Sequence, residues 1–404
     1  MPLRSMRDYL LRLRATTGLR EPGLVSTAVL TLTAVAFFRV ALLPEFGREL
    51  SMSTFQLGIV TTVFALGRLV ADLPGGHYAD KVRAINLMAL SAGGVALGSL
   101  LLGISRVALA VYVASFLLGI CSATTNATGM TFFSNVTGAS HRGTSMAVFS
   151  AALLGGQAIG PAAAGLIASV GGWRFAMFVG TATAAIVVLV LLTARATQPP
   201  PSSAASGDSS PADRDTQSRM PLLVLQSVSF AVFLTLGSVS QTMVPIIGAD
   251  DLGLGTAAIG VALGVGGLAR FAGTLVGGRL SDRLSRKSVL VPGLLVQAFG
   301  VALLSLDPTV AVWVTAIVVM SLASFAVPVA ATILGDISDP ARVGRQLGRF
   351  RFVGDLGLIV GPLVVTSLFA ELGRAVAFLF VAAVLTTAAL VSWRFLPETR
   401  GVHG

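Results

Sequence analysis

Charged side chains are scarce in this sequence. Only 11% of its 404 residues are Asp, Glu, Lys or Arg, whereas 54% are hydrophobic. Soluble domains carry about 25% charged residues, which cover the surface that faces water. The composition therefore excludes a soluble protein and indicates that most of the chain faces lipid.

Residues that support catalysis or metal binding are also scarce. The single cysteine, Cys121, excludes an internal disulfide, and its place in an apolar stretch predicts a buried apolar role. The three histidines, His77, His141 and His403, lack metal-ligand spacing. There is no phosphate-binding loop, no Ser/His/Asp set and no loop long enough for a soluble domain. We therefore expect no enzyme activity, no metal and no organic cofactor.

Long apolar stretches are abundant instead. Twelve of them are roughly 20 residues long or longer, enough for an α-helix to cross a bilayer. They form two sets of six, at residues 24–44, 54–79, 84–105, 107–133, 144–170 and 173–194, and at 221–248, 255–281, 287–306, 309–335, 346–372 and 374–395.

The two sets predict the domain organisation. Residues 195–220 between them are rich in Pro, Ser and Asp and lack apolar periodicity, which predicts a flexible linker. We expect an all-α integral membrane fold, with six-helix bundles at 24–194 and 221–395. A basic segment at 1–23 and a tail at 396–404 complete the chain.

The basic residues indicate an orientation. With the N-terminus inside, 21 of the 28 Lys and Arg residues fall on the cytoplasmic side, and only Arg48, Arg106, Arg174 and Arg374 fall outside. This bias follows the positive-inside rule. We expect no cleaved signal peptide, and we predict a multi-pass protein of the cytoplasmic (inner) membrane with both termini in the cytoplasm. The net charge of +10 reflects that topology and does not indicate nucleic-acid binding.

A repeat relates the two halves. The segment 75–81, GGHYADK, recurs at 277–283 as GGRLSDR. One register over so much chain indicates a duplicated unit. The same shift of 201 or 202 positions relates further residues: Gly58 and Gly260, Arg68 and Arg270, Gly156 and Gly357, and Pro161 and Pro362.

The repeated loop and the helix number carry a resemblance. The chain resembles the major facilitator superfamily over its whole length, and most closely its twelve-helix drug:proton antiporters. In that family the loop has a glycine, an Asp and then basic residues, and it sets the balance between inward and outward states. The matching residues are Gly76, Asp80 and Lys81 in the first copy and Gly278, Asp282 and Arg283 in the second.

Each loop copy also departs from the family pattern. Arg83 and Ser285 stand where the family has a further glycine. Asp336, at the end of the tenth predicted span, can accept from Arg279, Arg283 or Arg286. The resemblance implies two pseudo-symmetric bundles that work by alternating access.

The fifth predicted span carries a second family motif. Its residues Gly156, Gly160, Pro161 and Gly165 look like the exporter motif, although Ala164 replaces one glycine. An internal proline kinks a helix, and small residues let a neighbouring helix slide past. The alternative is a bend without directional meaning. The arginine that many proton-coupled exporters carry in the fourth helix is Ser115 here.

Five ionisable residues fall within predicted spans: Arg39, Arg68, Asp72, Arg270 and Asp355. Such groups cost about 2.5–3.5 kcal/mol each at the bilayer centre on insertion scales, so each needs a reason. Arg68 and Asp72 lie one turn apart, and the resemblance places their helix beside that of Asp355. We hypothesise that Arg68, Asp72 and Asp355 form an inter-half gate whose ion pairs depend on protonation. The alternative is a static salt bridge.

The resemblance also implies that the first, fourth, seventh and tenth helices line a central cavity. Apolar walls with few polar groups suit a lipophilic substrate, although packing is the alternative role for each aromatic residue. Unless a carboxylate such as Glu45 reaches it, Arg39 would attract an anion. The candidate cavity residues are Phe37, Phe38, Arg39, Tyr112, Asn126, Gln241, Phe325 and Pro328.

These expectations define a secondary active transporter. The leading interpretation is proton-coupled export of a lipophilic small molecule or drug, with the proton as coupling ion. The alternative is uptake or exchange of an organic anion, with Arg39, Arg68 and Arg270 as counter-charges. A non-transporting sensor or lipid scramblase on the same fold is a third class. The expected partners are a small-molecule substrate and membrane lipids, with no nucleic acid, and the protein is expected to be a monomer.

Overall fold

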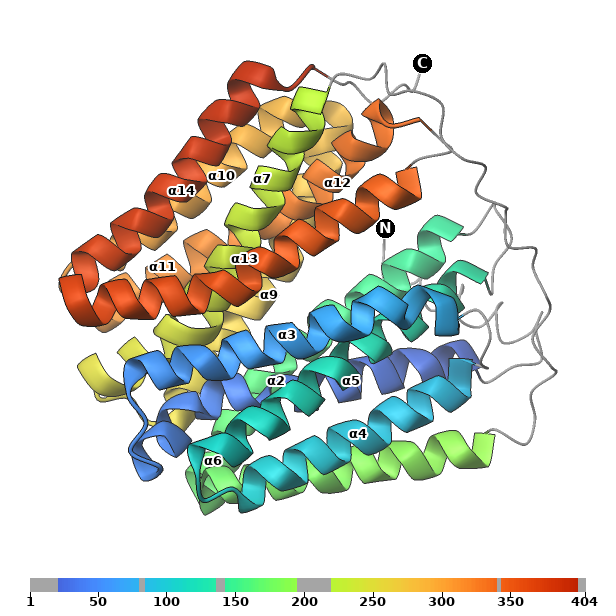
Figure 1. Cartoon of the computed structure of the whole chain (residues 1–404), viewed down its shortest axis with the longest axis vertical. Helices are drawn as coiled ribbons and strands as arrows, with labels where there is room; N and C mark the ends of the chain where they lie inside the picture. Colours follow the sequence, from blue (N-terminus) through green and yellow to red (C-terminus); the bar gives the residue numbers. More distant parts are fainter. Residues whose placement is uncertain (1–20, 80–83, 136–141, 195–218, 340–342, 399–404) are drawn as a thin grey trace.

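The structure, a computed structural model, describes residues 21–79, 84–135, 142–194, 219–339 and 343–398 (Figure 1). Within these ranges all regular structure is helical and no strand occurs. The helices form two bundles, one on each side of the linker in the sequence. The all-α membrane fold expected from the composition is confirmed.

The described residues of the N-terminal half form five helical elements. The longest of them is broken at Gly172, whose φ of 77° lies in the left-handed region that favours glycine. A continuous helix of its length would greatly exceed the roughly 30 Å of a bilayer's apolar core, so the break divides it into two spans. The elements are α2 (Glu21–Glu49), α3 (Thr54–Ala79), α4 (Ala84–Ile104), α5 (Ala108–Asn135) and α6 (Arg142–Ala194).

The C-terminal half repeats this pattern with more interruptions. Its first span contains two π-helical segments, and its fourth contains a 3-10 turn. Gly373, with φ 84°, makes the turn that Gly172 makes in the other half. The elements are α7 (Arg219–Thr235), η3 (Leu236–Met243), α8 (Val244–Ile246), η4 (Ile247–Asp251), α9 (Thr256–Arg283), α10 (Arg286–Leu303), α11 (Val310–Leu322), η5 (Ala323–Phe325), α12 (Ala326–Ile337), α13 (Val343–Leu372) and α14 (Arg374–Phe395).

The observed spans agree with the predicted ones apart from these interruptions. Among the described residues, 11 helices are long and apolar enough to cross a membrane. Ten coincide with single predicted spans, and Thr144–Thr193 covers two predicted spans that meet at Gly172. The π-helical and 3-10 segments were not predicted, because a shift of one residue within an apolar helix leaves no mark on its composition.

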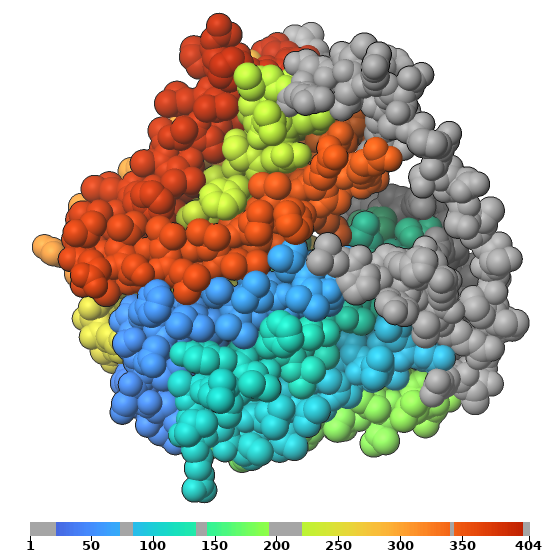
Figure 2. Space-filling model, in the orientation of Figure 1, coloured from blue at the N-terminus to red at the C-terminus, as the bar shows by residue number. Residues whose placement is uncertain are grey.

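The molecule has two ends, which we name by their connections. The linker end holds Ala194 and Arg219, the described residues that flank the linker. The turn end holds the short connections, such as residues 50–53 and the break at Gly172. In Figure 1, α3 and α13 lie side by side towards the turn end and diverge towards the linker end. Figure 2 shows a hollow between the halves on that side, so the halves are splayed at the linker end.

Two helix crossings join the halves, α3 with α13 and α6 with α9. The repeat relates the two crossings. A Cβ on Gly58 of α3 would lie 3.1 Å from the carbonyl oxygen of Pro362, and one on Gly260 of α9 would lie 2.5 Å from that of Pro161. Small residues let helices approach closely in a bilayer, where burial of apolar surface gives little drive for association. The repeated glycines and prolines therefore build both crossings.

Candidate functional site

A buried arginine lies at the contact between the halves. Arg39 of α2 is 1% exposed, and its Nη2 donates to Oε1 of Gln241 in η3 at 2.8 Å. Its guanidinium carbon lies 3.8 Å from the centre of the Phe64 ring, an attractive cation–π arrangement. Because Arg39 and Gln241 are repeat partners, 202 residues apart, this hydrogen bond joins equivalent positions of the two halves.

The π-helical segment η3 positions Gln241. The hydroxyl of Thr242 lies 2.8 Å from the carbonyl oxygen of Gly237, five residues earlier, and 2.9 Å from the hydroxyl of Thr61 in α3. The Thr242 hydroxyl thus supplies a hydrogen bond to the carbonyl of Gly237 within the π-helical segment. Segments of π-helix occur often at functional sites, because the extra residue re-aims the neighbouring side chains. Here it turns Gln241 towards Arg39.

A small cavity lies beside this pair, between the two halves. Its volume is about 50 Å³, whereas sites for drug-sized ligands measure about 300–1,000 Å³. The halves therefore enclose little space at the centre in this state. The wall is mostly apolar, and its polar side chains include those of Gln157, Gln241, Arg270 and Ser321. The apolar residues of the wall include Phe37, Val40, Leu154, Pro161, Leu263, Ile317 and Met320.

Three arginines around the centre keep unsatisfied N–H groups. Nε and Nη1 of Arg39, Nε of Arg68 and Nε of Arg270 are buried without a hydrogen-bond partner. Among the described residues, no carboxylate lies within the 4.0 Å ion-pair distance of any of the three. Glu45, the acid considered for Arg39, lies within electrostatic range of Arg48 instead, near the backbone of Trp173. The centre therefore carries positive charge that the nearest side chains do not pair.

The two membrane acids meet across the α3–α13 crossing. The carboxyl of Asp355, which is 4% exposed, lies within hydrogen-bonding reach of the carboxyl of Asp72. Arg68 and Arg351 lie within electrostatic range of Asp355. Ionised carboxylates only accept hydrogen bonds, so two of them can bond only when a proton lies between them. The structure thus brings the three predicted gate residues together, with an acid–acid contact in place of a closed Arg–Asp ion pair.

This acid pair lies at the linker-end limit of the crossing. Nearer the turn end, Gly58 contacts Thr366, and the hydroxyl of Thr62 donates to the carbonyl oxygen of Ile359 at 2.8 Å. Towards the linker end α3 and α13 diverge (Figure 1). A change at the acid pair is therefore placed to alter how far the halves separate.

At the turn end an ion pair joins the halves. Nε of Arg48 at the end of α2 lies 3.3 Å from Oδ1 of Asp250 in η4. These two residues are also repeat partners, with opposite charges. The sequence prediction missed this pair. The sequence did contain a signal for this pair. Arg48 and Asp250 are separated by 202 positions, the same separation as Arg39 and Gln241.

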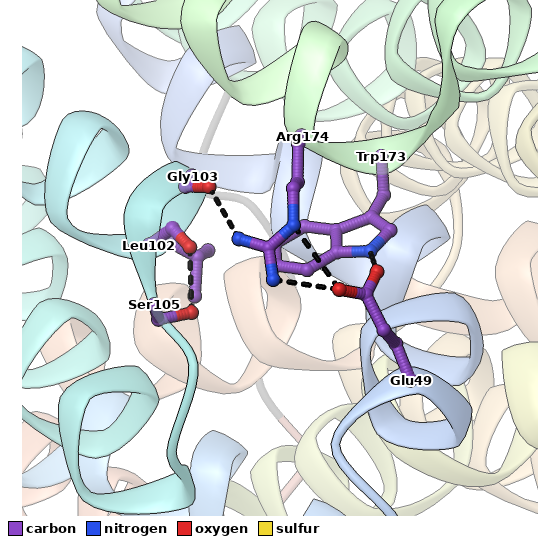
Figure 3. Close-up of polar contacts among 6 residues, drawn as sticks. All are labelled: Glu49, Leu102, Gly103, Ser105, Trp173 and Arg174. Carbon is purple, nitrogen blue, oxygen red and sulfur yellow. Dashed lines mark hydrogen bonds and ion pairs between the residues drawn. The ribbon is translucent and has the colours of Figure 1, made fainter.

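Each half has its own hydrogen bonds and ion pairs at the turn end. Oε2 of Glu49 accepts from Nε1 of Trp173 at 2.5 Å, and Oε1 accepts from Nη2 of Arg174 at 2.6 Å (Figure 3). Nη1 of Arg174 also donates to the carbonyl oxygen of Gly103 at 2.8 Å. The equivalent pair in the other half is Arg374 with Asp251. These contacts tie the first span of each half to its sixth at the turn end.

The repeated loop is described in part. Asp80 and Lys81 lie outside the described residues, and Gly76 belongs to the last turns of α3. In the second copy, Gly278, Asp282 and Arg283 are exposed at the end of α9. Asp336 pairs with Arg286, one of the three arginines considered for it, and Nη1 of Arg286 also donates to the carbonyl oxygen of Thr332 at 3.1 Å.

The exporter-like motif forms two packing surfaces of α6. Gly156 and Gly160 lie against the backbone of α2 in the same half, near Leu30 and Ala34. Gly165 lies against Gly260 and the carbonyl oxygen of Thr256 in the other half. This places the fifth span against the eighth. The motif thus explains a close helix crossing.

The predicted cavity residues divide into two groups. Phe37 and Gln241 line the cavity, and Arg39 is one hydrogen bond away from its wall. Phe38 instead packs on Gly180 within the N-terminal half. Phe325 is a correction as well, because its ring lies between α9 and α10 against Gly277 and Gly293. Tyr112 and Asn126 of α5 are half-buried and are not part of the cavity wall, and Pro328 of α12 is exposed away from it.

The fold and the site define a class, a polytopic membrane protein with a central cavity between two repeated bundles. The family model described as Major Facilitator Superfamily matches residues 24–246 and again 227–404. The two matches cover almost the whole chain, and each corresponds to one half of the repeat. The chain therefore belongs to the Major Facilitator Superfamily, and it is a transporter-family protein, not an enzyme.

Solved structures share the fold. A bacterial homolog to the human lysosomal transporter Spinster, in an inward-facing and occupied conformation, superposes with a TM-score of 0.73 at 15% identity, over 92% of this chain and 95% of that one. A D-xylose–proton symporter superposes with a TM-score of 0.71 at 17% identity, over 93% and 98%.

One curated relative matches a shorter segment. The magnetosome protein MamH of Paramagnetospirillum magneticum (strain ATCC 700264 / AMB-1) is 32% identical over 130 residues, 30% of this chain. The match spans 30% of the length of that relative. It supports common ancestry of that segment and carries no substrate assignment.

Proposed function

We propose that this protein is a secondary active transporter that takes up or exchanges an organic anion by alternating access. The observation that carries the proposal is a set of buried guanidinium N–H groups without partners. Arg270 is in the cavity wall, Arg39 is one hydrogen bond from it, and Arg68 lies within electrostatic range of Arg39. A charge held within the bilayer is retained at a cost of roughly 2.5–3.5 kcal/mol unless it is paired. A carboxylate or phosphate that accepts from these groups would supply the missing partner, and it suits the planar donor array of arginine.

The acid pair supplies the coupling in this proposal. When Asp72 and Asp355 share one proton, they carry one negative charge against the three arginines. Loss of that proton adds a second negative charge near Arg68 and weakens the attraction for an anion. A proton and an anion therefore favour each other's binding, which is the basis of proton-coupled anion uptake.

Orientation belongs to the same proposal. The linker end carries most of the basic residues, so we place it, with both termini, on the cytoplasmic side of the cytoplasmic membrane. In whole cells, a membrane-impermeant maleimide should label a Ser51→Cys variant at the turn end and leave a Ser209→Cys variant in the linker unlabelled. The reverse pattern would contradict this orientation.

Counterflow in proteoliposomes tests the substrate class. Labelled mono- and dicarboxylates and sugar phosphates are compared with the lipophilic cation tetraphenylphosphonium as cargo. We expect exchange of at least one anion, and loss of that exchange in Arg270→Gln and Arg39→Gln. The matched control is Arg106→Gln, at an exposed arginine of the turn end, which should behave as wild type.

A second candidate is proton-coupled export of a lipophilic small molecule. Its support is the exporter-like motif from Gly156 to Gly165 and the apolar wall that Phe37, Leu263 and Met320 give the cavity. Exchange of tetraphenylphosphonium, without exchange of any anion and without an effect of Arg270→Gln, would favour this candidate over the first.

A further inference from the structure

An apolar groove lies on the outside of the C-terminal half, away from the central cavity. It runs between α7 and α14, which lie next to each other (Figures 1 and 2), and its volume is about 470 Å³. Met220 and Val391 line it at the linker end, and Ala231 and Phe380 line it at the other end. The hydroxyl of Ser227 in its wall donates to the carbonyl oxygen of Val224 at 2.7 Å, so it offers no free donor there.

The length of the groove matches one leaflet of a bilayer. From Met220 to Ala231 the helical rise amounts to about 17 Å. Half of the roughly 30 Å apolar core of a membrane is about 15 Å. The groove begins at the first described turn of α7, where the span starts, and therefore follows the depth of the leaflet at the linker end.

A positive charge lies at the linker-end mouth of the groove. Arg394 follows Val391 by three residues and so lies on the same face of α14, one turn further on. It is exposed and has no acidic partner within ion-pair distance among the described residues. The ammonium group of Lys287 is bound nearby, to the carbonyl oxygen of Leu396 at 3.0 Å. Trp393 beside Arg394 is 63% exposed, as is typical of a residue at headgroup level.

We propose that this groove binds one acyl chain of an anionic phospholipid from the linker-end leaflet, with Arg394 contacting the phosphate. The apolar wall takes the chain, and the unpaired cation takes the headgroup. Lys287 adds to the positive potential at the same level. Because α7 continues into η3 and Gln241, a bound lipid would contact the helix that carries the central site.

Native mass spectrometry of the purified protein tests this, with titrations of phosphatidylglycerol and of phosphatidylcholine. We expect tighter binding of phosphatidylglycerol, and about a fivefold loss of that affinity in Arg394→Gln, the effect of about one surface charge near a membrane. Ala383→Phe, which fills the groove from an exposed wall position, should remove one tightly bound lipid. The controls Arg106→Gln and Ala185→Phe, at exposed positions outside the groove, should leave both results unchanged.

Three outcomes would overturn the proposal. If Ala383→Phe removes no bound lipid, the groove is not the site. If it removes a lipid while Arg394→Gln leaves the preference for phosphatidylglycerol intact, the occupant is not held by its charge. If inorganic phosphate competes as well as phosphatidylglycerol does, the mouth binds free phosphate and not a lipid.

Discussion

The crossings α3–α13 and α6–α9 are related by the repeat, and both bring a glycine against a proline-containing turn, yet they differ in charge. Arg68 of α3 and Arg270 of α9 are repeat partners. At the first crossing the arginine lies near Asp72 and Asp355. At the second crossing, the positions equivalent to those acids hold Thr274 and Leu154.

In the proposed function, this difference separates proton coupling from anion binding. There the α3–α13 crossing takes up and releases a proton, because it holds two carboxyls within hydrogen-bonding reach. The α6–α9 crossing holds a cation without an acid, and Arg270 and Leu154 both line the central cavity. One crossing is thus suited to coupling and the other to binding an anion.

The largest expected effect comes from removing the proton site. Asp355→Asn should reduce uptake driven by a pH gradient about 5–150-fold, the range of typical coupling free energies, because an amide cannot exchange the proton. Counterflow, which needs no net proton movement, should persist. Gradient-driven uptake and counterflow are measured in the same proteoliposomes.

The control for that experiment is Asp307→Asn, which removes an exposed acid at the turn end. Asp72→Asn should have a smaller effect than Asp355→Asn, because Asp72 is exposed and water can solvate the acid that remains. Unchanged gradient dependence in both variants would sink the coupling role of this crossing.

Making the second crossing resemble the first should weaken anion binding. Leu154→Asp places a carboxylate on the cavity wall that also contains Arg270, where it can pair with the guanidinium. We expect about a tenfold or greater loss of affinity for the transported anion, equal to about 1.4 kcal/mol or more. The measurement is the stabilisation of the purified protein against heat by that anion.

Leu154→Asn is the matched control, since it changes shape and polarity in the same way without adding charge. Equal losses in the Asp and Asn variants would show that packing at position 154, and not the charge of Arg270, controls binding.

Features of this structure that depend on local sequence could be predicted, whereas features that depend on helix packing could be predicted only in part. Spans, halves and pseudo-symmetry are encoded in local apolar length and in a constant register, so they could be predicted. The meeting of Asp72 with Asp355 was predicted through the family arrangement of helices. The sequence predicted that Asp336 pairs with one of three arginines. The packing of α10 on α12 makes Arg286 the partner.

Other parts of the site depend on helical phase, which composition does not fix. Phe325 was expected in the cavity because its span lines cavities in the family, but the 3-10 turn η5 directs its ring between α9 and α10. The contact of Gln241 with Arg39 likewise follows from the π-helical segment η3. Apolar residues on all sides of these spans leave no periodicity from which such turns could be read.

The two crossings should also differ in their tolerance of a methyl group. Gly260→Ala would place its Cβ 2.5 Å from the backbone oxygen of Pro161, whereas Gly58→Ala would first meet the side chain of Thr366 at 2.7 Å. A side chain can rotate away and a backbone cannot. We expect Gly260→Ala to cost about 1–3 kcal/mol, as overpacking does, and Gly58→Ala to cost less.

Thermal unfolding in detergent measures this difference, with Gly278→Ala as control because nothing lies within 4 Å of its Cβ position. Equal destabilisation at positions 58 and 260 would mean that the two crossings are equally rigid.

The smallest expected effect lies at the turn end, where Arg48 and Asp250 join the halves. Their side chains are 61% and 49% exposed, so the pair contributes at most about 1 kcal/mol. Neutralising Arg48 with Gln should therefore leave folding unchanged and shift the population towards opening at the turn end by at most about fivefold. Distances between spin labels on the two halves report that population. Neutralising Arg106, an exposed arginine at the turn end, should not move the population. If both variants shift it equally, the Arg48–Asp250 pair is not a gate, and the balance between states responds to surface charge in general.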